Sequence, residues 1–162
     1  MTDMTDATPA PGHANLPLVL IAEDGDEYTA RFSRLLGASF RFLRAGSFAE
    51  AVAALAAPAA QGEEVRVLVL DLDFRRTSPA LLVDERGLPV PLAEAARVAA
   101  VEGILLLRAL RARGLRVPAL LCADLDDPEQ EQRLCLELAP LEISPSTEGM
   151  PDVARRLRGL CG

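Results

Sequence analysis

Two short apolar segments that end in carboxylates constrain the fold of this chain most strongly. The segment LVLIA (18–22) is followed by Glu23 and Asp24, and VRVLVL (65–70) is followed by Asp71. An uninterrupted apolar run of this length is typical of a strand that is buried on both faces of a sheet. We therefore expect both segments to be inner strands of a sheet that helices cover on each side.

The rest of the chain alternates between short apolar runs and helical stripes. Further strands are predicted at 40–44, 117–122 and 141–143, and helices at 26–36, 48–57, 128–138 and 151–160. Alternation of this kind indicates a parallel sheet in an α/β fold. The functional crevice of such sheets lies at the carboxyl ends of the strands, so Glu23, Asp24 and Asp71 are expected to gather there.

Two places need a separate interpretation. Segment 75–91 breaks the alternation with two apolar runs around a DERG turn, which predicts a hairpin or an ordered loop. A long helix is predicted after it, over 92–113, and Gly103 inside this helix indicates a kink or a close contact. Earlier in the chain, Ser47 and Glu50 have the spacing of a capping box at the start of the helix predicted at 48–57.

Composition excludes several classes of function. The net charge of −7 argues against a groove for nucleic acid and against a surface for anionic lipid. Segments of the roughly 20 apolar residues that a bilayer requires are absent from the sequence. Residues 1–16 are expected to form a flexible tail before a single domain at 17–162, and their acids do not fit a signal peptide, so a cytoplasmic protein is expected. The widely spaced Cys122, Cys135 and Cys161 are expected to be free thiols.

Three carboxylates at one rim of a sheet have a chemical meaning. Like charges at close range repel one another, and a divalent cation such as Mg²⁺ removes that repulsion with two or three carboxylate ligands. Asp71 could then act as a carboxylate nucleophile toward a phosphoryl donor. A structural alternative stays open, in which Asp24 and Asp26 begin a helix and Asp71 and Asp73 form turns.

The ordered set of segments resembles the receiver domains of bacterial response regulators. LVLIAEDGDEYTARFSRLL is similar to the family's first strand, acidic pair and first helix, VLVLDLDF to its phosphoacceptor strand, and GILLLRALRARGLRVPALLCAD to its third helix and fourth strand. The resemblance implies a flavodoxin-like (CheY-like) fold with five parallel strands and an insert at about 75–91. It also implies that Glu23 and Asp24 bind Mg²⁺ together with Asp71, which is the phosphoacceptor. A histidine kinase or another signalling regulator is the implied partner.

The sequence departs from the family at the positions that read the phosphoryl group. All 17 basic residues are Arg, so the family's lysine is absent, and Ser144 stands in its place before Pro145. The family's Thr or Ser is replaced by Cys122 or Ala123, and neither side chain is a good donor. Arg75 and Arg76 are candidates for contacts with phosphate, although exposed loop charge is the simpler interpretation.

These departures favour a divergent receiver that acts through protein–protein interaction and is not an enzyme, with aspartyl phosphorylation altered or lost. A phosphorylatable regulator that uses Asp71, with an Arg in place of the lysine, is the alternative. VLVLDLDFRRT also resembles the nucleophile strand of haloacid dehalogenase-type phosphohydrolases, with Asp71 as nucleophile and Asp73 as acid–base. That motif lies too far along the chain for this family. The partner, the pathway and a homodimeric state are left open by the sequence.

Overall fold

A computed structural model describes residue 12 and residues 15–162 of the chain. The predicted tail at 1–16 therefore lies largely outside the described residues. All the strands and helices lie between residue 18 and residue 161.

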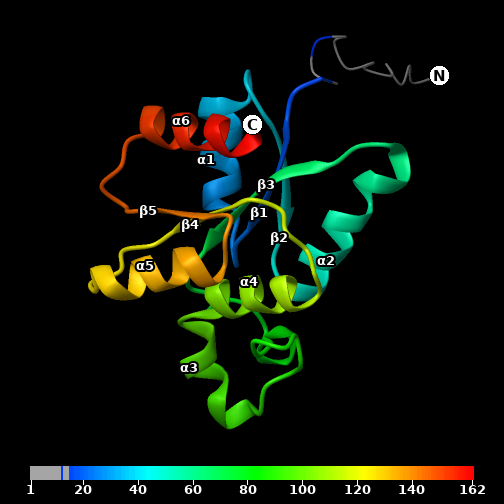
Figure 1. The fold of residues 1–162 in the computed structure, drawn as a ribbon. Helices are drawn as coiled ribbons and strands as arrows, with labels where there is room; N and C mark the ends of the chain where they lie inside the picture. Colours follow the sequence, from blue (N-terminus) through cyan, green and yellow to red (C-terminus); the bar gives the residue numbers. More distant parts are fainter. Residues whose placement is uncertain (1–11, 13–14) are drawn as a thin grey trace, which may run out of the picture.

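Five parallel strands form one sheet in the order β2-β1-β3-β4-β5 (Figure 1). The strands are β1 (Leu18–Ala22), β2 (Arg41–Ala45), β3 (Val65–Asp71), β4 (Ala119–Cys122) and β5 (Leu141–Ser144). Every residue of β1 is buried, because helices cover both faces of the sheet. The α/β prediction, with a doubly wound parallel sheet of five strands, is confirmed.

The helices divide between the two faces of the sheet. On one face, Val19 and Ile21 of β1 share an apolar core with residues of the first and last helices, and on the other face Leu18 and Leu20 share a larger core with the remaining long helices. The first group is α1 (Glu27–Leu36) and α6 (Met150–Cys161), and the second is α2 (Phe48–Ala56), α4 (Glu102–Ala112) and α5 (Pro128–Glu137). Alternate side chains of one strand thus enter opposite cores, as the pleat of a strand requires.

Local signals in the sequence set where two of these helices begin. The Ser47 side chain accepts a hydrogen bond from the Glu50 amide at 3.2 Å, and the Glu50 carboxylate accepts one from the Gly46 amide at 2.6 Å. Asp127 caps α5 in the same way, with Pro128 in the first turn. Each cap satisfies amides that the first helical turn leaves without partners.

The chain between β3 and α4, residues 72–101, forms an insert that projects beyond the sheet (Figure 1). Val83 and Pro89 form an isolated antiparallel bridge around the DERG turn, and the Asp84 carboxylate accepts hydrogen bonds from the amides of Arg86 and Leu88. The predicted hairpin or ordered loop is therefore an ordered hairpin. The insert also contains three short helical segments on either side of the hairpin: η2 (Pro79–Leu81), η3 (Leu92–Glu94) and α3 (Ala95–Ala99).

The predicted continuous helix over 92–113 is wrong. The helical conformation is interrupted after α3, at Ala100 and Val101, and α4 begins anew at Glu102. The cause is a contact with the end of β3: the Gly103 amide donates to the Leu72 carbonyl at 3.0 Å. This tertiary contact overrides the helical propensity of the alanine-rich segment.

Gly103 makes the close contact that its position in the sequence predicted. A Cβ atom at this position would lie 2.0 Å from the Asp71 carbonyl oxygen, so no larger residue fits without movement of the backbone. The start of α4 is therefore pressed directly against the end of β3. Among the helices of the described residues, none reaches the combination of length and apolar character needed to cross a bilayer.

Candidate functional site

The carboxyl ends of the inner strands lie at one rim of the sheet, because all the strands are parallel. Asp71 lies opposite Cys122, and Cys122 lies opposite Ser144. Glu23 directly follows Ala22, which lies opposite the residue before Asp71. The structure thus brings the predicted site residues to the same rim, but their side chains divide between two adjoining hollows and one helix terminus.

The first hollow contains most of the acids and both candidate arginines. We call it the acidic hollow; it is open to solvent, has a volume of about 310 Å³ and is lined by Asp24, Asp71, Asp73, Arg75 and Arg76. Glu23 is not among the described residues that line this hollow. Two of the three predicted metal ligands therefore share this hollow and the third does not.

The Glu23 carboxylate caps helix α1. Glu23 is fully buried, and its carboxylate accepts hydrogen bonds from the Tyr28 amide at 3.0 Å, the Thr29 amide at 2.7 Å and the Thr29 hydroxyl at 2.7 Å. Negative charge at this place satisfies free amides and offsets the helix dipole. Both oxygens of the Glu23 carboxylate are therefore occupied by donors in the first turn of α1.

Arg76 of the insert neutralises the second member of the acidic pair. Its amide donates to Asp24 Oδ2 at 2.9 Å, and its guanidinium donates to Asp24 Oδ1 at 3.1 Å. The same guanidinium donates to both carboxylate oxygens of Glu27, at 2.6 Å and 2.9 Å. These bonds lower the pKa of Glu27 to about 2 and raise the pKa of Arg76, so both partners of this ion pair stay charged.

Arg75 makes a separate, local pair with Asp73. The Arg75 amide donates to Asp73 Oδ1 at 2.9 Å, and its Nε donates to Oδ2 at 2.5 Å. The guanidinium hydrogen bond holds the pKa of Asp73 below its ordinary value. The two adjacent arginines thus neutralise different acids of the same hollow.

Asp71 is left as the acid of the hollow that forms no ion pair among the described residues. Its Oδ1 accepts a hydrogen bond from the Leu72 amide at 2.8 Å. Burial, reinforced by the charges of Asp24 and Asp73, raises the pKa of Asp71 to about 6. Asp71 is therefore ionised only above weakly acidic pH.

The acids do not fit a divalent cation as they are arranged. Both oxygens of Asp24 and of Asp73 are held by arginine donors, and Glu23 is turned to α1. Within residues 12 and 15–162, no three acidic, cysteine or histidine side chains are placed to bind one metal ion. Mg²⁺ needs free carboxylate oxygens, so it would have to displace Arg76 from Asp24.

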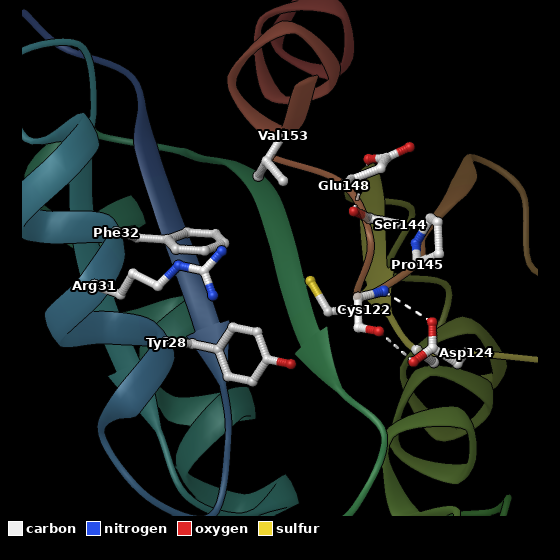
Figure 2. A pocket seen from close by; sticks show the side chains of 11 residues that line it. Tyr28, Arg31, Phe32, Cys122, Asp124, Ser144, Pro145, Glu148 and Val153 are labelled. Carbon is white, nitrogen blue, oxygen red and sulfur yellow. Dashed lines mark hydrogen bonds between the residues drawn. The ribbon is translucent and has the colours of Figure 1, made fainter. Parts of the chain in front are cut away.

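The second hollow adjoins the first and contains the residues at the two positions that depart from the receiver pattern. It has a volume of about 160 Å³, and its lining includes Cys122, Ala123 and Ser144. Figure 2 shows Cys122 and Ser144 on one side of it and Tyr28 and Arg31 of α1 on the other. The Ser144 hydroxyl donates to Glu148 at 2.8 Å. Burial and the charge of Asp71 raise the pKa of the Cys122 thiol to about 12, so the thiol stays protonated at neutral pH.

The rim is predicted by the sequence, but the ion pair between Arg76 and Glu27 is not. Glu27 was not a candidate, because it lies 49 positions from Arg76 and is an ordinary acid in the first turn of a helix. Tyr28 and Arg31 were also missed. Their spacing of three residues on the stripe of α1 that faces the rim is the signal that could have found them.

Comparisons with known proteins give a match at the level of structure. No family model matches the sequence, and no curated protein matches it significantly. The receiver domain of the Francisella response regulator 1452 is similar in structure, with a TM-score of 0.60 and 16% identity over 90% of this chain and 96% of that domain.

Two further structures agree. The chemotaxis protein CheY4 of Vibrio cholerae matches with a TM-score of 0.58 and 15% identity over 90% of this chain and 98% of that one. A response regulator receiver domain protein from Clostridium thermocellum matches with a TM-score of 0.61 and 13% identity, over 90% and 94% of the two chains. At such low identities the likeness concerns the fold. The chain therefore has the CheY-like fold of response-regulator receiver domains.

Proposed function

We propose that this chain is a divergent receiver module that signals by binding another protein, and that an internal arginine takes the place of the divalent cation in its acidic site. The observation that carries the proposal is the position of Arg76, which is bound to both oxygens of Asp24. A cation supplied by the chain itself removes the repulsion among the acids without any ligand. The folded unit is residues 17–162, and the insert is part of it.

The groups that would read a phosphoryl group at Asp71 are also changed. The Ala123 side chain has no donor, Cys122 holds a protonated thiol, and the Ser144 hydroxyl is already bonded to Glu148. A receiver switches only if phosphorylation stabilises one of its two arrangements more than the other. Without a free hydroxyl or an ammonium group at these positions to bind the phosphoryl oxygens, phosphorylation would favour neither arrangement strongly. The binding surface is then constitutive.

One observation favours the alternative of a phosphorylatable regulator. Asp71 lines the open acidic hollow without an ion pair of its own, so its carboxylate is accessible to a phosphoryl donor. Arg75 and Arg76 line the same hollow, and arginine binds phosphate oxygens well. In this case Arg76 would leave Asp24 for the phosphoryl group.

The two proposals are separated by intact mass after incubation with a small phosphodonor and Mg²⁺. The divergent receiver predicts no adduct that depends on Asp71, in the wild-type chain or in the Asp71→Asn control. A stable adduct in the wild-type chain that Asp71→Asn abolishes would support the alternative, provided that it also changes partner binding or self-association. An adduct that both chains acquire reports modification at another residue and leaves the divergent receiver standing.

The partner follows from the same chemistry only as a class. A histidine kinase or another regulator of signalling is the expected class, and neither nucleic acid nor lipid suits the net charge of −7. Capture of such a partner should be equal for the wild-type chain and for Asp71→Asn if the surface is constitutive. A partner that binds only the phosphorylated chain would contradict this.

A further inference from the structure

A buried carboxyl group joins the insert to the rest of the domain. Glu102, the first residue of α4, is 1% exposed. Its Oε1 accepts a hydrogen bond from the Val83 amide in the hairpin at 2.9 Å. Its Oε2 is buried and has no hydrogen-bond partner among the described residues. Glu102 also has no arginine partner among the ion pairs of the described chain, in contrast to Glu27, Glu137 and Glu148.

The surroundings of Glu102 favour its neutral form. Val83, whose amide binds Glu102, and Ile104, two residues further along α4, both belong to the larger buried apolar core. The charged group that acts on Glu102 from the hairpin is Asp84, and it is negative. Burial, with the charge of Asp84, raises the pKa of Glu102 to about 7, against the opposing effect of the Val83 hydrogen bond. An unpaired buried carboxylate carries a large desolvation penalty.

The position of Glu102 couples the hairpin to the end of β3. The next residue, Gly103, donates to the Leu72 carbonyl at 3.0 Å and is packed against the Asp71 carbonyl. On the insert side, the Phe74 amide donates to the Ala99 carbonyl at 2.8 Å. The hairpin, the start of α4 and the strand that carries Asp71 are therefore held together at one junction, and Glu102 is the titratable group inside it.

We propose that Glu102 is a proton-operated latch, which holds the hairpin of residues 82–91 against the start of α4 when the carboxyl group is neutral and loosens it when the group is ionised. This device does not depend on the proposed function of the acidic hollow, since Glu102 lies outside it. Loosening exposes the hairpin and frees the start of α4 beside Asp71. The insert thereby becomes a surface that responds to pH.

The direction of the pH dependence follows from linkage. The pKa of Glu102 in the closed state is above the value of 4.5 that it has when exposed. The closed state therefore binds the proton more tightly than the open state, and it is most stable at pH values below 4.5. The equilibrium constant for opening should increase with pH, by up to about tenfold per pH unit, until it levels off near the closed-state pKa of about 7.

Hydrogen exchange followed by mass spectrometry tests the latch on the full chain. Protection factors, corrected for intrinsic exchange, are compared for residues 82–91 and for β3 between about pH 5 and about pH 8. The wild-type hairpin should lose at least tenfold in protection over this range while β3 keeps its own. Glu102→Gln is neutral at every pH and retains an acceptor for the Val83 amide, so its hairpin should show no such loss. The matched control Glu94→Gln, an exposed acid of the same insert, should behave as the wild type does.

Constant protection of the wild-type hairpin over this range would overturn the proposal, and so would an unchanged pH dependence in Glu102→Gln. If Glu102→Gln does not fold, titration of the Glu102 side-chain carboxyl by carbon NMR in the wild-type chain decides the matter. A midpoint at or below about pH 5 would exclude a neutral latch, because an exposed glutamate titrates near about 4.3. A midpoint near neutrality, with a loss of protection that develops below this pH and levels off near it, would establish it.

Discussion

Arg76 reaches from the insert to Asp24 and binds both oxygens of its carboxylate, one through the backbone amide at 2.9 Å and the other through the guanidinium at 3.1 Å. The Asp24 side chain is only 5% exposed in this pair, whereas Arg76 is 58% exposed. The acid is therefore almost fully buried, while the arginine that neutralises it stays open to solvent. A second acid, Glu27, holds the other side of the guanidinium and fixes its orientation.

Removal of this arginine should create an affinity for divalent cations. In Arg76→Ala, Asp24 and Asp71 would face each other across the acidic hollow without a counter-ion, and Mg²⁺ would relieve the repulsion with two carboxylates and water as ligands. Calorimetric titration with Mg²⁺ should show binding to Arg76→Ala that is at least tenfold tighter than to the wild type. Arg75→Ala is the matched control, since it leaves the pair of Arg76 and Asp24 intact. Equal Mg²⁺ binding by the wild type and Arg76→Ala would show that the arginine does not compete with the metal.

Loss of the Glu23 carboxylate should destabilise the fold and have no metal dependence. Glu23→Ala leaves the Tyr28 and Thr29 amides without their acceptor at the start of α1. We expect the free energy of unfolding to fall by about 2 kcal/mol in urea denaturation, as for the loss of a strong helix cap. The exposed Glu64→Ala should change it by less than about 0.5 kcal/mol. A wild-type stability that rises with Mg²⁺, and that no longer does so in Glu23→Ala, would assign Glu23 to a metal site instead.

Neutralisation of Asp71 should change how stability depends on pH. The folded-state pKa of Asp71 is raised to about 6 from an ordinary 3.8, so its contribution to stability is complete below the lower value and is lost as pH rises to the upper one. Asp71→Asn lacks this loss and should be more stable than the wild type at about pH 7.5, by about 1–2 kcal/mol after allowance for the partial exposure of the group. Urea denaturation at several pH values measures the difference.

The control for this comparison is Asp126→Asn, because Asp126 is exposed and lies away from the hollow. Its stability curve should follow that of the wild type at every pH. If Asp71→Asn were less stable than the wild type at neutral pH, the carboxylate would have a favourable partner that the acidic hollow does not supply. The increase in stability is therefore a direct test of whether Asp71 is left without a counter-ion.

The sheet and its rim could be predicted because they depend on local patterns. Continuous apolar runs such as 18–22 and 65–70 have one favourable environment, the interior of a covered parallel sheet, and the carboxyl ends of parallel strands coincide by geometry. Ser47 and Asp127 mark helix starts through bonds to residues two or three positions away. Each of these features can be inferred from a short window of sequence.

The arrangement within the site could not be predicted, because it depends on distant pairs. Asp24 and Arg76 are 52 positions apart, and no local pattern distinguishes Arg76 from Arg75, which binds Asp73 instead. The same reason explains the helix that was predicted across 92–113. Its residues favour a helix throughout, and two contacts with the chain at and after the end of β3 accompany its interruption. The Gly103 amide donates to the Leu72 carbonyl, and the Ala99 carbonyl accepts from the Phe74 amide.

The contact between Gly103 and β3 should be intolerant of a single methyl group. In Gly103→Ala the new Cβ would lie 2.0 Å from the Asp71 carbonyl oxygen, which is backbone and cannot move aside alone. We expect a loss of about 1–3 kcal/mol in the free energy of unfolding, the usual range for overpacking, although alanine is the better helix former. Gly159→Ala in α6 is the matched control, because its Cβ would meet no atom within 4 Å, and it should gain up to about 1 kcal/mol. Urea denaturation of both variants checks the opposite signs. A stabilised Gly103→Ala would mean that α4 can withdraw from the end of β3, and the junction that links the insert to Asp71 would then be looser than the contacts of Gly103 imply.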